Sequence, residues 1–301
     1  MAFCFNFTKD SEENILNTDD ILLDAPVSKK KKKEQVVVTD FKEITVEDCK
    51  TDYPYDLEVN TYQLTDNITV SCYDAGAIEE ILKKDKDDSS SVVKATSCHS
   101  DLLPNVYEGG LTVWECGIDL ASYVAKDVDF TDKMVLELGC GAGIPGICAM
   151  LCGAKVLHFQ DYNEEVLKEY TIPNVTQLNM DDDVKCTCRY FSGDWSQFSD
   201  KIDNEQRYDI ILTAETIYNP DNYQKLHDVF TSQLDKQGTV YLAAKSNYFG
   251  VGGGIGLFED FTNGKGQFFC KICKTIEAGV PREIMQLKWK DTNIDKQTEK
   301  T

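Results

Sequence analysis

The segment that most constrains the fold of this chain is VLELGCGAGIPGI, which begins at Val135. An apolar, strand-like run leads into a glycine-rich turn and then into a helix-like run. The glycines give two overlapping patterns. Gly139, Gly141 and Gly143 suggest a methyl-donor site, whereas Gly141, Gly143 and Gly146 spell G-x-G-x-x-G, the pattern of a dinucleotide site. The segment predicts a strand–turn–helix unit that holds a cofactor, and other residues must decide which one.

Strand-like and helix-like runs alternate from Ser97 onward. The predicted helices cover residues 112–125, 143–153, 164–175 and 222–234, and the predicted strands cover residues 133–138, 154–161, 186–191, 208–215 and 238–245. Residues 267–275 and 282–290 are expected to close the domain as a hairpin. This order predicts an α/β fold: a Rossmann-like, seven-stranded, mostly parallel sheet with an antiparallel C-terminal hairpin and helices on both faces. Ligands of such sheets bind at the carboxyl ends of the strands, where the strand order reverses.

Charge and composition set the domain organisation. We expect a disordered N-terminal arm (1–55), an extension packed on the core (56–96), the main domain (97–291) and a polar tail (292–301). The chain has 31 Lys and Arg against 52 Asp and Glu, a net charge of −21, which repels nucleic-acid phosphate and attracts basic protein surfaces. Direct nucleic-acid binding is therefore not expected. The run Lys29–Lys33 is either a short nuclear-import signal or a solvated charge block.

The sequence also bears on the compartment. We find neither a signal peptide nor an apolar run of membrane-spanning length, and we expect an intracellular, soluble monomer in the cytoplasm and nucleus, nucleolus included. In a reducing compartment most of the 12 cysteines should be buried thiols. The pairs Cys186/Cys188 and Cys270/Cys273 fall in strand-like runs, so a zinc site is disfavoured and no metal is expected.

Charged residues at the strand ends favour the methyl donor over a dinucleotide. Glu137 precedes the glycine turn, where a carboxylate would repel a pyrophosphate but suits the cationic S-adenosylmethionine. Asp161 ends the next strand and could accept both ribose hydroxyls; its alternative role is a helix N-cap. Asp194 could take the adenine amino group and Trp195 could flank the ring, although a packing tryptophan is equally compatible with the sequence.

In order along the chain, VLELGCGAGIPGI, HFQDYN, GDW, LTAETIYNP and YFGVGGG, with FNFT, CHSDLLPNVYEGGL and VWEC before them, resemble the seven-β-strand methyltransferases. The similarity is greatest to the protein-histidine methyltransferases of the methyltransferase-like protein 18 type and covers residues 97–290 and the first few residues. It implies transfer of a methyl group from S-adenosylmethionine to a histidine ring nitrogen of a basic partner, the third large-subunit ribosomal protein. The arm departs from the family, and Ala214 stands where the family has serine.

The resemblance also implies cofactor-binding residues. Gly139, Gly141 and the following loop would hold the methionine end, with Glu137 beside them, and Ala214 would form the floor of the pocket. The residues implied to cover the cofactor or to contact its ribose and adenine are Val113, Trp114, Glu115, Cys116, Gly117, Gln160, Asp161, Tyr162, Gly193, Asp194 and Trp195. The alternative for VWEC is an amphipathic helix whose Trp114 packs in the core.

Imidazole methylation needs alignment more than activation, because the neutral ring has a nitrogen lone pair. The methylated ring is a cation, and a nearby carboxylate would stabilise it or accept its other proton. Glu215, after the fourth strand, is the candidate, with Tyr218 as a wall or hydrogen-bond partner. The alternative for Glu215 is a charge at a helix N-terminus.

Other features point away from further chemistry. His99, His158 and His227 fit no catalytic or metal pattern, and structural roles are favoured. The YFGVGGGIG segment is expected to be a mobile loop at the substrate entrance rather than a tight backbone crossing. Two other functions stay open: a lysine or small-molecule methyltransferase, and a non-catalytic adaptor that binds a basic protein. The intact set of cofactor residues favours an enzyme.

Overall fold

The computed structural model describes residues 40–49, 53, 56–84, 90–97, 102–103, 106–180, 184–202 and 207–290. The run Lys29–Lys33, His99 and the tail 292–301 lie outside these residues. Among the described helices, none combines the length and the apolar character that crossing a membrane requires.

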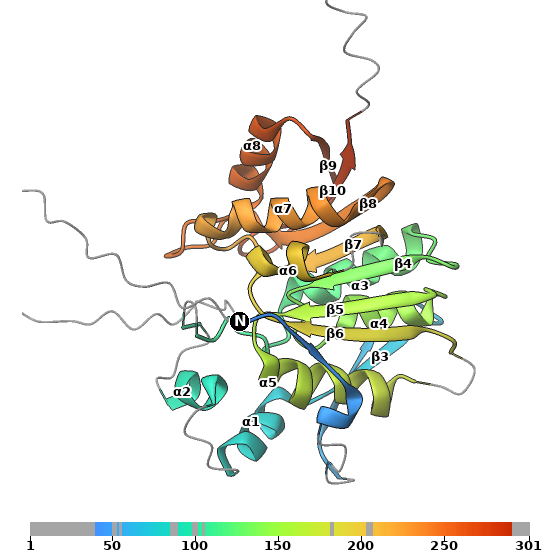
Figure 1. The fold of residues 1–301 in the computed structure, drawn as a ribbon, viewed down its shortest axis with the longest axis vertical. Coiled ribbons are helices and arrows are strands. Elements are labelled where there is room, and N and C mark those ends of the chain that lie inside the picture. Colours follow the sequence, from blue (N-terminus) through green and yellow to red (C-terminus); the bar gives the residue numbers. More distant parts are fainter. Residues whose placement is uncertain are drawn as a thin grey trace, which may run out of the picture.

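An eight-stranded sheet forms the centre of the molecule (Figure 1). From edge to edge the strands are β1 (Lys42–Ile44), β6 (Thr187–Ser192), β5 (Val156–Asp161), β4 (Met134–Leu138), β7 (Tyr208–Ala214), β8 (Leu234–Lys245), β10 (Arg282–Trp289) and β9 (Phe268–Ile276). The five strands from β6 to β8 are parallel, and β1, β10 and β9 are antiparallel to their neighbours. The predicted fold class, with its C-terminal hairpin, is confirmed, except that the additional strand β1 makes the sheet eight-stranded rather than seven-stranded. Strand order reverses at β4, which has β5 on one side and β7 on the other.

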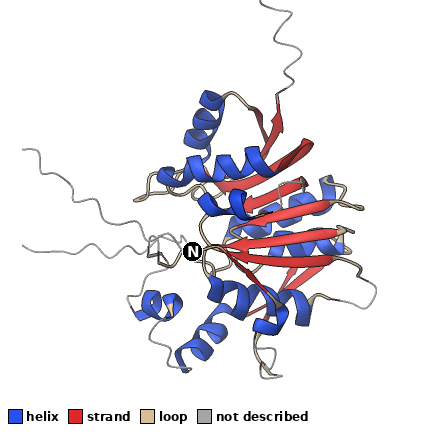
Figure 2. Cartoon of the chain, viewed as in Figure 1, coloured by secondary structure: helices blue, strands red, loops and turns tan. Residues whose placement is uncertain are grey.

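Helices cover both faces of the sheet (Figure 2). α3 (Glu115–Asp127) and α4 (Ile144–Leu151) pack in one apolar cluster, and α6 (Trp195–Lys201), α7 (Tyr223–Gln233) and α8 (Ile255–Lys265) in the other. Alternation along β4 sends Val135 to the first cluster and Leu136 to the second, each fully buried. Burial of one such side chain contributes about 1.5–3 kcal/mol. The two cores hold the central strands rigidly under the carboxyl-end loops.

Residues 56–84 and 90–97 form an extension on the α3–α4 side. A hairpin of β2 (Val59–Gln63) and β3 (Thr69–Tyr73) is followed by α1 (Ala75–Lys84) and α2 (Ser91–Ser97). The Tyr73 N–H donates to the Asn174 side chain at 2.9 Å, and the Ser71 N–H donates to that of Asn179 at 3.0 Å. These bonds attach β3 to the helical segment that follows β5.

The helical segment that follows β5 is not the regular α-helix that was predicted for residues 164–175. After α5 (Glu164–Val166), residues Leu167–Thr171 and Asn174–Leu178 form π-helical turns. Pro173 has no N–H to donate to the carbonyl of Glu169 in an α-helical bond. The Tyr53 hydroxyl donates to that carbonyl instead, at 2.7 Å.

The structure corrects the sequence predictions in three further places. The prediction of a disordered arm is wrong for residues 40–49, which contain β1 and a 3₁₀ turn, Val46–Asp48. Neither α6 nor α8 was predicted, and α8 begins directly after Gly254. A second 3₁₀ turn, Pro220–Asn222, precedes α7.

Candidate functional site

A cavity of about 960 Å³, its open mouth included, lies at the carboxyl ends of β4, β5, β6 and β7. This is the place where the strand order reverses, as the sequence predicted for a ligand site. Its walls come from the loops after these strands and from the segment that leads into α3. The lining residues are Glu108, Gly109, Gly110, Thr112, Val113, Trp114, Gly117, Glu137, Gly139, Cys140, Gly141, Ala142, Ile144, Pro145, Asp161, Tyr162, Gly193, Asp194, Trp195, Ala214, Glu215, Thr216, Tyr218 and Asn222.

Glu137 caps the helix that follows the glycine turn. Its Oε2 accepts the Gly146 N–H at 2.8 Å, and a Cβ at Gly146 would lie 2.5 Å from that oxygen. Gly146 is in the first turn of α4, where a dinucleotide pyrophosphate would need the N–H groups. Burial raises the pKa of Glu137 well above its usual value. The G-x-G-x-x-G pattern therefore reflects close packing under a carboxylate and leaves no phosphate cradle at this N–H.

The glycine turn is held by Asp161. Gly139 and Gly141 have φ of +62° and +50°, in the left-handed region that glycine tolerates. Asp161 Oδ2 accepts the Gly141 N–H at 2.9 Å, and Oδ1 accepts the Asn163 N–H at 3.1 Å. Burial raises the Asp161 pKa to about 6. Asn163, and not Asp161, is the N-cap residue of α5, so the alternative interpretation of Asp161 is wrong.

Asp194 and Trp195 form the wall beyond β6. Asp194 is the N-cap of α6: it accepts the Ser196 N–H at 2.8 Å and pairs with Lys225 at 2.7 Å. Burial disfavours its charge, but the Lys225 and Ser196 hydrogen bonds outweigh that effect and lower its pKa. The Trp195 indole N–H donates to Gln160 Oε1 at 2.7 Å. Gln160 is 1% exposed and lies behind this wall, so the expectation that it meets the cofactor is corrected to a role in orienting Trp195.

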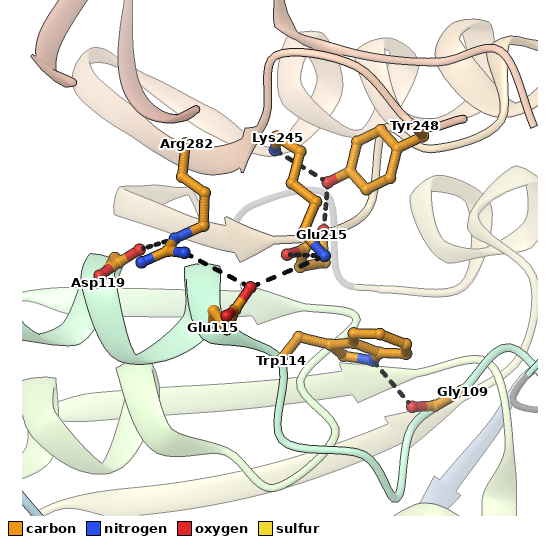
Figure 3. A network of polar contacts seen from close by, with 8 residues as sticks. All are labelled: Gly109, Trp114, Glu115, Asp119, Glu215, Lys245, Tyr248 and Arg282. Atoms are coloured by element: carbon orange, nitrogen blue, oxygen red, sulfur yellow. Dashed lines mark hydrogen bonds and ion pairs between the residues drawn. The ribbon is translucent and has the colours of Figure 1, made fainter. Parts of the chain in front are cut away.

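The opposite wall is the segment before α3. The Trp114 indole N–H donates to the Gly109 carbonyl at 3.1 Å (Figure 3). The Tyr218 hydroxyl donates to the Glu108 carboxylate and so ties this segment to the loop after β7. Trp114 lines the cavity, contrary to the alternative of a core tryptophan.

Two residues of the VWEC motif do not reach the cavity. Cys116 is fully buried among the apolar side chains beneath α3. The Glu115 side chain is 47% exposed and interacts with Lys245 and Arg282 on the outer side of the helix (Figure 3). Position along α3 explains both corrections, because successive residues of a helix point to different sides.

Glu215 has the most unusual environment in the site. It is one of two non-glycine residues with positive φ in the described chain, at +58°, and it is 8% exposed. Backbone strain of this kind gathers at functional sites. The Tyr248 hydroxyl donates to Oε2, whereas Oε1 has no hydrogen-bond partner among the described residues and lies 3.7 Å from the Lys245 ammonium. No helix begins at Glu215, so the alternative of a helix-terminal charge is wrong.

The glycines after β8 lock the loop that carries Glu215. The Gly253 N–H donates to the Tyr218 carbonyl at 2.9 Å, and a Cβ at Gly253 would lie 2.1 Å from the Ile217 carbonyl. A Cβ at Gly254 would lie 2.2 Å from the Ser246 carbonyl. The segment is a tight backbone crossing, so the favoured expectation of a mobile entrance loop is corrected.

Fourteen of the seventeen predicted site residues line the cavity, Glu115, Cys116 and Gln160 being the others. The wall at residues 108–112 was not predicted from the sequence. The Gly109–Gly110 pair was the available signal, since a Cβ at Gly141 would lie 2.8 Å from the Gly110 carbonyl and the two turns need this close approach. Of the missed residues, Thr216 and Asn222 carried no pattern of their own.

The described histidines lie outside the cavity lining, and of the described cysteines Cys140 lines it while Cys116 lies beside Glu215. His158 Nδ1 is hydrogen-bonded to the Tyr208 hydroxyl at 2.7 Å, burial lowers its pKa to about 4, and His227 is buried against aromatic rings. The ten described cysteines are free thiols, of which four are buried and six half-buried. Among the described side chains no three potential metal ligands converge.

The chain is similar to known methyltransferases. The family model described as "Lysine methyltransferase" matches residues 105–261, just over half of the chain. The chain belongs to this methyltransferase family. Over 238 residues, 71% of this chain and 66% of the relative, it is 42% identical to the "Histidine protein methyltransferase 1 homolog" of Mus musculus. The homologue of the same name from Dictyostelium discoideum is 42% identical over 191 residues, 62% of this chain and 60% of the relative.

A more distant relative carries another substrate in its name. The "Protein N-terminal and lysine N-methyltransferase efm7" of Schizosaccharomyces pombe is 32% identical over 120 residues, 38% of this chain and 46% of the relative. The chain spans just under two thirds of the length of the first histidine methyltransferase relatives, 66% and 63% for the mouse and cattle proteins.

S-adenosylmethionine is the cofactor of this methyltransferase family, and the cavity fits it. Five lining side chains are carboxylates, and the lining contains no Lys, Arg or His among the described residues. Such a lining suits a ligand with an ammonium and a sulfonium and disfavours a phosphate. The capped first turn of α4 leads to the same conclusion.

Proposed function

We propose that the chain transfers a methyl group from S-adenosylmethionine to a ring nitrogen of a histidine in a basic large-subunit ribosomal protein, the third of that subunit. The observation that carries the proposal is Glu215, a strained and buried residue of the cavity lining whose Oε1 is itself buried without a hydrogen-bond partner in the described chain. The names of the relatives that are 42% identical support histidine as the acceptor.

Three parts of the chain would hold the cofactor. The turn of Gly139 and Gly141 would bind the methionine end, Asp161 the ribose, and the wall of Asp194 and Trp195 the adenine. When bound, S-adenosylmethionine supplies an electrophilic methyl group on a sulfonium sulfur. Trp114 and the Tyr218–Glu108 hydrogen bond close the cavity from the side of α3 and would exclude water.

Glu215 would orient the acceptor. A neutral imidazole has one N–H and one lone pair, so donation of its N–H to Glu215 Oε1 leaves the other nitrogen facing the cavity. The positive charge that develops on the ring is then stabilised by the same carboxylate. Tyr218 would act as a wall, because its hydroxyl is already used by Glu108.

Lysine is the second candidate acceptor, and the description of the matching family favours it. The pH profile separates the two. A histidine acceptor, with an ordinary pKa of about 6.5, loses its lone pair on acidification, so the rate at saturating cofactor should decline below roughly pH 6.5. A lysine acceptor, with a pKa of about 10.4, should gain rate well above neutral pH.

The deciding experiment labels ribosomes that lack the modification with a radioactive methyl donor and locates the label by mass spectrometry. Label on a histidine ring of a large-subunit protein is expected. Label on lysine instead would exclude the histidine assignment, and failure of the protein to bind S-adenosylhomocysteine in calorimetry would exclude the cofactor. We expect the encounter with the substrate to occur in the cytoplasm and nucleus, between a monomeric enzyme and the basic protein, without nucleic-acid contacts.

A further inference from the structure

Five side chains of alternating charge run outward from the cavity (Figure 3). They come from the loop after β7, the end of β8, helix α3 and the start of β10. Successive pairs are separated by 3.7, 4.0, 3.5 and 2.5 Å, in the order Glu215, Lys245, Glu115, Arg282 and Asp119. Lys245 is 8% exposed and is the cation next to the cavity.

The distances show which ion pairs within this row of five side chains are the closest. Arg282 lies closer to Asp119 (2.5 Å) than to Glu115 (3.5 Å), so Asp119 is its main partner. Lys245 lies between Glu115 and Glu215, and its ammonium is also 5.5 Å from the centre of the Trp114 ring. The Lys245 ammonium thus faces carboxylates on α3 and after β7 and an aromatic wall of the cavity.

Lys245 balances the charge of Glu215 without occupying its free oxygen. At 3.7 Å the ammonium lies outside hydrogen-bonding distance of Oε1, and the Tyr248 hydroxyl is bonded to the other oxygen, Oε2. Oε1 is buried and has no hydrogen-bond partner in the described chain, so it keeps its capacity to accept a hydrogen bond from a ligand that reaches it. The net charge that this ligand meets is reduced by the ammonium behind the carboxylate.

We propose that Lys245 is a specificity-determining residue that lowers the affinity of this end of the cavity for a cationic ammonium relative to a neutral ring N–H. The inference deepens the proposed function, because it assumes that the acceptor reaches Glu215. Two cations about 6 Å apart at an effective dielectric constant of about 20 repel strongly enough to weaken binding on the order of a hundredfold. On binding, a neutral imidazole does not experience this repulsion, whereas a protonated lysine side chain does. The charge that develops on the ring during transfer is stabilised by Glu215, which is nearer to the ring than Lys245.

The first test compares acceptor proteins that carry histidine or lysine at the labelled position. The parent is expected to prefer histidine in kcat/KM, and Lys245→Met should narrow that preference at least tenfold, mainly through a lower KM for the lysine version. Lys245→Arg keeps the charge and should keep the preference. Lys236→Met, on the same strand but over the Trp289 ring, is the matched control. An unchanged preference in Lys245→Met overturns the inference.

A second measurement does not need methyl transfer. With S-adenosylhomocysteine bound, n-butylammonium and 4-methylimidazole are titrated at about pH 9, where the first is charged and the second neutral. Lys245→Met should strengthen n-butylammonium binding at least tenfold relative to the imidazole. Glu115→Gln, at a half-exposed position, removes the second carboxylate partner of Lys245 and leaves Glu215, the first one. This variant should weaken n-butylammonium binding.

The two failures can be told apart. If the unsubstituted protein labels no histidine, the proposed function fails. The role of Lys245 is then tested by the n-butylammonium and 4-methylimidazole titration alone. If histidine is labelled but n-butylammonium binds the parent and Lys245→Met equally, the proposed function stands and the role of Lys245 is rejected.

Discussion

Asp161 combines a structural and a binding role at one carboxylate. Its two oxygens hold the glycine turn and the start of α5, and burial raises its pKa to about 6. The unfolded-state pKa of aspartate is about 3.9. The folded state therefore binds the proton more tightly, and the contribution of Asp161 to stability is present below pH 4 and is lost as the pH rises to about 6.

The same titration should appear in cofactor binding. Ribose hydroxyls donate to the ionised carboxylate, so the affinity for S-adenosylhomocysteine should rise between about pH 5 and pH 7. Asp161→Ala should weaken binding at neutral pH by about 1–3 kcal/mol and remove this dependence. Calorimetry across the pH range measures both effects, with the exposed Asp228→Ala as control. Parent-like binding by Asp161→Ala would contradict the ribose assignment.

Glu215→Gln isolates the charge of the second key carboxylate. The amide keeps the shape and an acceptor oxygen but cannot stabilise a developing cation on the acceptor ring. We expect kcat to fall about 100-fold, with the affinity for S-adenosylhomocysteine changed less than twofold. Steady-state kinetics and calorimetry on the same preparation test this, and an unchanged kcat would remove Glu215 from the mechanism.

At the scale of elements, the loop after β8 supports the loop after β7. A side chain at Gly253 would collide with the Ile217 and Tyr218 carbonyls, so the backbone beside Glu215 would have to move. Gly253→Ala should lower the free energy of unfolding by about 1–3 kcal/mol and reduce kcat. Gly256→Ala, where nothing lies within 4 Å of the new Cβ, should do neither. Denaturant unfolding of both variants measures the difference in their free energies of unfolding. Equal stability of Gly253→Ala and Gly256→Ala would show that the tight backbone crossing does not stabilise the fold.

Elements with a strong local pattern were predictable from sequence, and those that depend on tertiary contacts were not. The sequences of the parallel strands are apolar runs because both faces of these strands are buried. Helix α6 is short, and α8 follows glycines that normally disfavour a helix, so neither gave a clear signal. The π-helical turns depend on Pro173 and on Tyr53, which is more than a hundred residues away in sequence.

The site shows the same division. Glu137, Asp161 and Glu215 could be predicted because each lies at or next to the carboxyl end of a β-strand, and such ends meet at the edge where ligands bind. Lys245 also ends a strand, but its importance depends on Glu115 and Arg282, which only the folded chain brings beside it. Gln160 is buried behind Gly193 and Trp195, to which its side chain is hydrogen-bonded, and this position outside the lining could not be predicted from the sequence.

For the whole molecule, net charge governs the encounter with substrate. A chain of net charge −21 should attract a basic protein over long range, and salt screens this attraction. We expect kcat/KM with the intact protein substrate to fall several-fold between about 50 and 500 mM salt. Calorimetry of S-adenosylhomocysteine in the same buffers is the control and should change little. A flat kcat/KM profile would count against charge-assisted association.

Strand β1 closes one edge of the sheet, although it lies more than fifty residues before the segment that the family model matches. Its neighbour Phe41 packs on Phe191 and Phe198, and the Phe41 Cα would lie 2.8 Å from a Cβ at Gly193. A shortened protein that starts at the matched segment would expose the backbone N–H and C=O groups of β6, a template for pairing with another chain. Self-association through that open edge, together with exposure of the core face on which residues 56–84 and 90–97 pack, would then be the obstacle to studying the matched segment alone.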